Sequence, residues 1–118
     1  MSSQIGYFDK LKSTVGSELV LGTMNQYGAA NLAIGTSWVP VGPASTKGGI
    51  FFIVGKNASN ANVGFWLVAH TVDADNVVVV ISSDNSTGLT INFRGSDGIL
   101  QMYVTTGAMH IDIAGWWI

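Results

Sequence analysis

Residues 89–104 read LTINFRGSDGILQMYV, and this stretch decides the fold class. Apolar side chains at Leu89, Ile91 and Phe93 alternate with polar ones, which is the period of a strand buried on one face. The segment RGSDG at 94–98 has the glycine and aspartate of a hairpin turn, and a second alternating run follows it. The stretch therefore predicts two antiparallel strands joined by a tight turn.

The same pattern of short apolar runs, separated by Gly, Asn, Asp and Ser, continues along the chain from residue 18. Many short strands without intervening helices indicate an all-β protein, and we expect an antiparallel two-sheet sandwich. Strands are predicted near 18–22, 31–35, 37–41, 49–55, 63–71, 76–82, 89–94, 98–104 and 108–114.

Residues 1–17 have a different pattern. Ile5, Phe8, Leu11 (or Lys12) and Val15 recur at helical spacing, with Ser2 or Ser3 as the candidate N-cap and Gly16 as the candidate stop. We therefore expect a short N-terminal helix, with an irregular lead-in as the alternative. This divides the chain into an N-terminal segment, 1–17, and a β-sandwich, 18–118.

Three predicted strands are apolar on both faces. The segment IFFIV at 50–54, the segment VVVVI at 77–81 and the segment VGFWLVA at 63–69 all lack a polar side. A two-sheet sandwich has one core, so each strand needs only one apolar face, and the second must be covered. Another copy of the chain would cover it, which predicts an obligate homo-oligomer.

The amino-acid composition excludes several classes of function. The chain of 118 residues contains no cysteine, so disulfides and thiol chemistry are excluded. Only 10% of the residues are charged and the net charge is -2, which leaves no basic patch for nucleic acid. No apolar run approaches the roughly 18 residues of a membrane-spanning segment, so we expect no membrane embedding. Solubility through hydroxyls and amides is typical of extracellular or virion β-proteins.

No catalytic constellation is visible in the sequence. The two histidines, His70 and His110, have no nucleophile motif near them, and most of the aspartates occur in turn-like contexts. We therefore expect that the protein is not an enzyme and has no catalytic residues.

We also expect no metal and no cofactor. Asp73, Asp75 and Asp84 are spaced like part of a calcium loop, but the apolar run between them occupies the ligand positions. A looser calcium site from the same three residues is the alternative. His110 and Asp112 share one face of a strand and could hold a metal on a trimer axis, but a solvated edge is the commoner arrangement.

Three segments resemble a known family. GGIFFIVG at 48–55, GFWLV at 64–68 and MHIDIAGWWI at 109–118 are similar in style to the C-terminal receptor-binding tip (knob) of a bacteriophage tail fibre or tail needle. The resemblance implies a homotrimeric, jelly-roll-like sandwich in the virion tail. It also implies that residues 1–17 join a stalk made with other virion tail proteins. Such a tip adsorbs the virion to a host cell-surface glycan or outer-membrane protein.

The predicted receptor site lies on polar loops at one end of the sandwich. The candidate loops are Gly22–Asn31, Gly42–Gly48 and Gly55–Asn62, which offer amides, hydroxyls and Tyr27 as an exposed stacking platform. The candidate receptor-binding residues are Asn25, Tyr27, Trp38, Lys47, Lys56, Asn57 and Asn60. Trp38 has an alternative role as a core or interface anchor. The alternative functions are a structural virion protein (decoration, capsid or hub) and a secreted lectin-like trimer.

Overall fold

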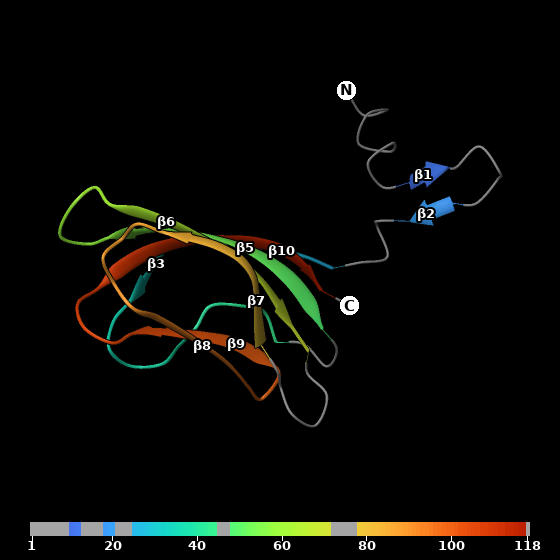
Figure 1. The fold of residues 1–118 in the computed structure, drawn as a ribbon. Coiled ribbons are helices and arrows are strands. Elements are labelled where there is room, and N and C mark those ends of the chain that lie inside the picture. The colour runs from blue at the N-terminus through green and yellow to red at the C-terminus, as the bar shows by residue number, and fades with distance from the viewer. Residues whose placement is uncertain (1–9, 13–17, 21–24, 45–47, 72–77, 118) are drawn as a thin grey trace.

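The computed structural model describes residues 10–12, 18–20, 25–44, 48–71 and 78–117. Two antiparallel β-sheets lie face to face, and Figure 1 shows them as an upper and a lower layer. The described residues contain no helix. The predicted all-β two-sheet sandwich is therefore confirmed, while the jelly-roll topology and the homotrimer stay predictions.

The larger sheet has five strands in the order β3-β10-β5-β6-β7. Their bounds are β3 Asn25–Ile34, β5 Gly49–Asn57, β6 Val63–His70, β7 Val78–Asn85 and β10 Met109–Trp117. The smaller sheet has the order β4-β9-β8, with β4 Val39–Pro40, β8 Ile91–Ser96 and β9 Ile99–Val104. The C-terminal strand β10 thus lies inside the larger sheet, between β3 and β5.

The core lies between the two sheets and follows from the period of two along the strands. On β5, Phe51 and Ile53 are buried, while Ile50 and Phe52, which alternate with them, are exposed. The same alternation on β6, β9 and β10 directs one side of each strand inward. The fully or nearly fully buried core residues are Ile34, Val41, Phe51, Ile53, Trp66, Val68, Leu100, Met102, Val104, Met109, Ile111 and Ile113.

The β8–β9 hairpin forms as the sequence predicts. Asp97 and Gly98 occupy its turn with φ values of 52° and 76°. Two central residues with positive φ define the type I′ turn, which matches the twist of paired strands and favours Asp-Gly. The turn sets the register in which Arg94 pairs with Gln101.

Strand β3 is an edge strand. Residues 31–34 were predicted as a strand, whereas residues 25–30 were expected in the loop Gly22–Asn31. Asn25 to Ile34 pair with β10, and the register shifts between Ile111 and Ile113. At this bulge Asn31 has a φ of 56°, and its backbone N–H donates to Asp112 Oδ1 at 2.9 Å. Asparagine tolerates the left-handed conformation, so the residue that suggested a loop in fact forms a bulge within a strand.

At the N-terminus, Lys10–Lys12 form strand β1, which pairs with strand β2, Glu18–Val20. The prediction of helix is therefore wrong at Lys10–Lys12, where backbone pairing with β2 replaces helical hydrogen bonding. The rest of the predicted helix, residues 1–9 and 13–17, lies outside the described residues.

Two other predicted strands have shifted bounds. Only Val39–Pro40 of the predicted 37–41 strand are paired, and β7 extends through polar residues to Asn85. In the part of the chain that the structure describes, no helix has the length and hydrophobicity to cross a membrane.

Candidate functional site

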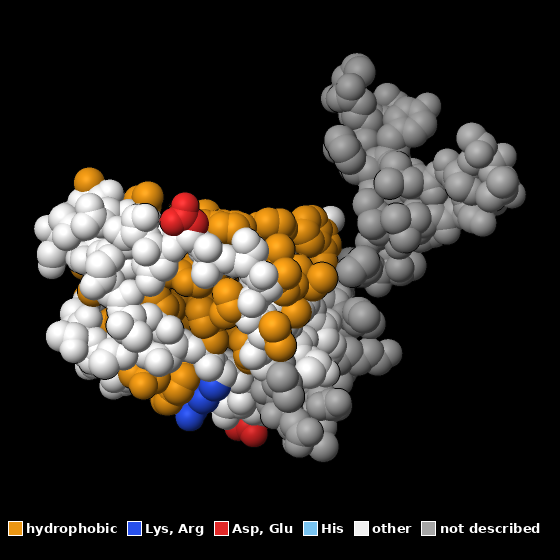
Figure 2. All heavy atoms as spheres, viewed as in Figure 1, with side chains coloured by type: hydrophobic (Ala, Val, Ile, Leu, Met, Phe, Trp, Pro, Cys, Tyr) orange, Lys and Arg blue, Asp and Glu red, His pale blue; other side chains and the backbone are white. Residues whose placement is uncertain are grey.

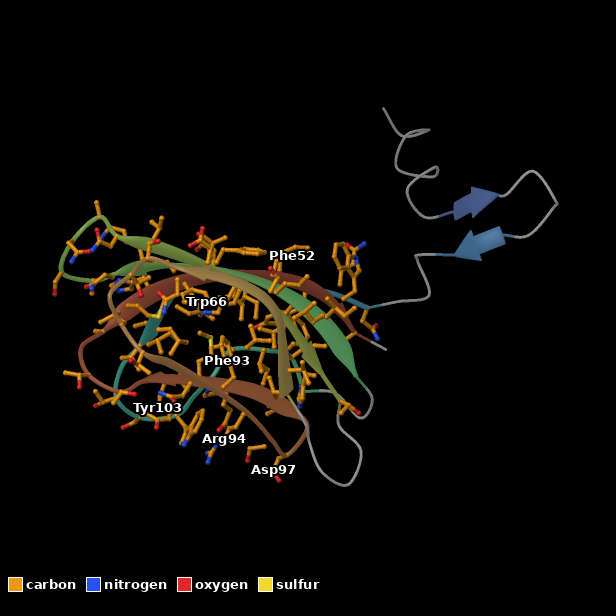
Figure 3. The ribbon with its side chains drawn as sticks, viewed as in Figure 1. Phe52, Trp66, Phe93, Arg94, Asp97 and Tyr103 are labelled. Atoms are coloured by element: carbon orange, nitrogen blue, oxygen red, sulfur yellow. The ribbon has the colours of Figure 1, made fainter. Side chains whose placement is uncertain are left out.

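The outward side of the smaller sheet gathers two aromatic rings, one guanidinium and two amides. Figure 3 shows Arg94 and Tyr103 on the outer side of the lower layer, whereas Phe93 points inward toward Trp66. We call this surface the polar-aromatic face. Its residues are Trp38, Asn92, Arg94, Gln101 and Tyr103.

The two rings and the guanidinium of the polar-aromatic face are in direct contact. The ring of Trp38 meets the ring of Tyr103 edge-on, with centroids 4.4 Å apart. The Arg94 guanidinium carbon lies 4.3 Å from the centroid of the Trp38 ring, which is a cation–π contact. Arg94 Nε donates to Gln101 Oε1 at 2.7 Å, so the guanidinium is held from two sides. Trp38 and Tyr103 are half-buried and Arg94 is exposed.

Hydrogen bonds across the hairpin hold the amide of Asn92. Its Nδ2 donates to Thr105 Oγ1 at 3.0 Å and, more weakly, to the carbonyl oxygen of Tyr103 at 3.4 Å. Because Asn92 pairs with Tyr103 in the sheet, this side chain lies beside the aromatic pair. The face therefore combines planar apolar surface with ordered donors and acceptors, which is the chemistry that sugar-binding sites use.

Of the predicted receptor residues, only Trp38 belongs to the polar-aromatic face. Asn25 begins β3 and pairs with Trp117 at one end of the larger sheet. Tyr27 was expected on a loop, but it lies within β3. It is half-buried, packs against the core and meets the Phe51 ring edge-on at 6.4 Å between centroids.

Three other predicted residues lie at the opposite end of the larger sheet, and Lys47 lies outside the described residues. Lys56 is exposed and donates to the carbonyl oxygen of Asn57 at 3.1 Å. Asn57 is only 9% exposed, and both ends of its amide bind within the molecule. Asn60 is exposed, and its Oδ1 accepts from the Asn62 N–H at 2.9 Å.

The expectation that the three polar loops share one end of the sandwich is wrong. Gly48 directly precedes strand β5, and residues 58–62 directly follow it. A nine-residue strand is about 30 Å long, so Gly48 of the predicted loop Gly42–Gly48 and residues 58–62 of the predicted loop Gly55–Asn62 lie at opposite ends of this strand. The third predicted loop, Gly22–Asn31, contains most of the paired part of β3 instead.

Four residues of the polar-aromatic face were not among the predicted site residues: Asn92, Arg94, Gln101 and Tyr103. Alternation in LTINFR and ILQMYV already placed them on the wet side of the hairpin, which was the available signal. Their proximity to Trp38 could not be inferred in the same way, because that tryptophan is far away in the sequence. It reaches the hairpin through the pairing of Val39 with Met102.

The outward side of the larger sheet has the opposite character. We call it the apolar face and define it by its exposed large residues: Ile50, Phe52, Val54, Val63, Val79 and Trp116. Figure 3 shows Phe52 above the upper layer, and Figure 2 shows hydrophobic side chains along this upper rim. Lys56, His110, Asp84 and Asp112 border the face at one end.

No metal-binding group was found within the described residues: no three His, Asp or Glu side chains there lie close enough to share an ion. His110 and Asp112 are both exposed on β10. Asp73 and Asp75 of the looser calcium alternative lie outside the described residues.

The fold of this sandwich is similar to that of part of a phage protein. The tailspike protein of Acinetobacter phage vB_ApiP_P1 superposes with a TM-score of 0.54 at 16% sequence identity, over 89% of this chain and 23% of the tailspike. The chain thus has the fold of part of a phage tailspike and spans about a quarter of its length. No family model and no curated protein matches the sequence.

A second tailspike, gp49 of Acinetobacter baumannii bacteriophage Fri1, aligns with a TM-score of 0.39 and 10% identity, over 92% of this chain and 19% of that one. Both neighbours are phage tailspike proteins. The gp49 protein is described as a capsular polysaccharide depolymerase, and this contradicts the expectation that the chain is not an enzyme.

Proposed function

We propose that this chain is a domain of a phage tail protein that attaches the virion to polysaccharide on the host surface. The observation that carries the proposal is the contact of Trp38, Tyr103 and Arg94 on the outward side of the smaller sheet. The fold of the vB_ApiP_P1 tailspike supports the phage origin, and its use on a virion supports an extracellular setting.

The chemistry of the polar-aromatic face suits a carbohydrate. Sugar rings present C–H faces that pack on aromatic rings, while their hydroxyls need donors and acceptors at the rim. Tyr103 and Trp38 supply the rings, and the amides of Asn92 and Gln101 supply both donors and acceptors. Arg94 is the only cation among the residues of this face, so nothing here resembles a phosphate-backbone surface.

The proposed assembly is a homotrimer in which the apolar face is covered. Its six residues expose between 40% and 53% of their surface. With side chains of roughly 150–250 Å² each, they present on the order of 600 Å² of apolar surface. A standard interface buries about 800 Å² per partner, so this face supplies most of one. Copies of the same chain present matching apolar surfaces, as symmetric assembly requires.

The apolar face also favours a second candidate function. A structural virion protein would use it against other tail proteins and would bind no receptor. The two functions differ in what the polar-aromatic face does: it binds polysaccharide in the first and remains solvated in the second.

Binding to capsular polysaccharides tests the proposed function. We expect the purified chain to bind one or more polymers of a capsular panel that includes Acinetobacter baumannii types. With soluble oligosaccharides, which remove avidity, Trp38→Ala should weaken the affinity about 10-fold or more. The control Trp116→Ala removes an exposed tryptophan from the apolar face and should change the affinity less than twofold. Following polymer size in the same incubation detects depolymerisation.

A wild-type chain that binds no polymer, yet associates with purified virions, would support the structural function instead. Equal losses for the two tryptophan variants would place the binding surface elsewhere on the molecule.

A further inference from the structure

We infer that Arg94 makes the polar-aromatic face selective for sugar residues that carry a carboxylate. This inference rests on the proposed function and specifies the substrate class of the same site. It starts from the sequence, in which Arg94 is the only arginine. The residue lies on β8, and its side chain is exposed on the outer side of the smaller sheet (Figure 3).

The guanidinium of Arg94 is fixed before any ligand arrives. It lies over the Trp38 ring at 4.3 Å, and its Nε donates to Gln101 Oε1 at 2.7 Å. A free arginine side chain loses rotamer entropy when a ligand immobilises it, which weakens binding. Here stacking and one hydrogen bond have already restricted it, so a ligand meets a preorganised group.

The two terminal nitrogens of Arg94 remain available. Across the described residues, Nε is the one nitrogen of this side chain that makes a hydrogen bond within the protein. The Nη groups therefore keep their donors for a ligand. A planar pair of N–H donors matches the two oxygens of a carboxylate in a bidentate arrangement, which adds geometric selectivity to the charge attraction.

The neighbours of Arg94 specify a sugar acid with a single negative charge. Tyr103 and Trp38 lie beside the guanidinium and can carry the ring of the sugar. Among the lysines, only Lys56 has a side chain that the structure describes, and it lies on the outer side of the other sheet, where it cannot support a doubly charged group such as a phosphate monoester beside Arg94. Asp97, at the tip of the same hairpin, is exposed and would repel a doubly charged group more strongly than a single carboxylate. A uronic acid, or another sugar with one carboxylate, satisfies all of these conditions.

The test compares each bound polysaccharide with its carboxyl-reduced form, in which the carboxylate becomes a neutral alcohol. We expect the wild-type chain to bind the carboxylated polymer at least 10-fold more tightly than the reduced one. Arg94→Gln should lose at least 10-fold on the carboxylated polymer and less than twofold on the reduced polymer. Arg94→Lys keeps the positive charge but not the planar pair of N–H donors. Its affinity for the carboxylated polymer should lie between those of the wild type and Arg94→Gln. Lys56→Gln is the matched control and should behave as wild type.

Nuclear magnetic resonance gives a direct readout on the unmodified chain. Because the chain has one arginine, its Nε–H signal is unique. Sodium glucuronate should shift this signal in a saturable way, whereas glucose with matched sodium chloride should leave it in place.

The outcomes separate this inference from the proposed function. Equal binding of carboxylated and reduced polymers, or an equal loss by Arg94→Gln on both, would overturn the carboxylate selectivity and leave polysaccharide binding intact. Failure of the wild-type chain to bind any polymer would overturn both.

Discussion

The side chain of Asn57 forms hydrogen bonds to the loop between β5 and β6 and to the segment between β7 and β8. Its removal should destabilise the fold measurably. Its Nδ2 donates to the carbonyl oxygen of Thr87 at 2.9 Å, and its Oδ1 accepts from the Ser59 N–H at 2.9 Å. Thr87 is fully buried and lies in the segment between β7 and β8. Asn57→Ala therefore removes two hydrogen bonds and leaves a buried carbonyl group without this partner.

The magnitude follows from the burial of these groups. Each hydrogen bond contributes about 1 kcal/mol net, and a buried acceptor left unsatisfied costs about 1–3 kcal/mol. We expect Asn57→Ala to lower the free energy of unfolding by about 2–3 kcal/mol. At roughly 4 °C per kcal/mol for a domain of this size, Tm should fall by about 10 °C.

The assay is urea denaturation followed by tryptophan fluorescence, with all variants at one protein concentration so that assembly affects them equally. Asn60→Ala is the control: it removes the same amide from the same hairpin, but its bond to Asn62 is local and exposed. We expect it to cost less than about 0.5 kcal/mol. Similar losses for the two variants, or a loss under about 0.5 kcal/mol for Asn57→Ala, would contradict the stabilising role assigned to the buried Asn57 amide.

Asn57→Asp extends the same test to pH. The new carboxylate would face the Thr87 carbonyl oxygen, so burial and repulsion would raise its pKa above the unfolded value. The folded state then binds more protons than the unfolded state, and stability must fall as pH rises through the raised pKa. We therefore expect the variant to become more stable, relative to wild type, as the pH is lowered toward 4.

Three further predictions follow from backbone packing and from the apolar face. Gly115→Ala should cost about 2–3 kcal/mol in urea denaturation, because its Cβ would overlap the Ile50 carbonyl oxygen and the Phe51 ring. Gly28→Ala is the control and should cost less than about 1 kcal/mol, because its Cβ would meet only the Ile113 carbonyl oxygen at 3.8 Å, an ordinary van der Waals contact. Gly98→Ala, at a φ of 76°, should cost about 1–2 kcal/mol by the same assay. By light scattering, wild type should have three times the 12.4 kDa subunit mass and Phe52→Lys the mass of one subunit; a monomeric wild type would contradict the proposed interface.

The sandwich could be predicted from the sequence because alternation reports burial strand by strand. The runs around Phe51, Trp66 and Ile111 form strands as expected, and the Asp97-Gly98 pair forms the turn. Strand β3 could not be predicted over its full length, because Gln-Tyr-Gly-Ala-Ala-Asn has little strand propensity of its own. It is a strand because the backbone of β10 offers it hydrogen bonds, which is a tertiary effect.

The candidate site was less predictable than the fold. Composition drew attention to loops rich in Asn and Gly, yet Asn57 is buried there and Tyr27 packs against the core. The polar-aromatic face depends on a long-range pairing that brings Trp38 to Arg94. Local sequence specifies which way Arg94 points, but the partner that immobilises it comes from another part of the chain.

The two outer faces of the sandwich determine where a trimer could meet its ligand. If the apolar faces close around a central axis, the polar-aromatic faces of the three subunits must point away from that axis, about a third of a turn apart. Each Arg94 side chain would then point away from the trimer axis, perpendicular to it. Such a trimer would bind polysaccharide molecules at its sides. Its three sites could hold separate polysaccharide molecules, so that one trimer cross-links them within a capsule.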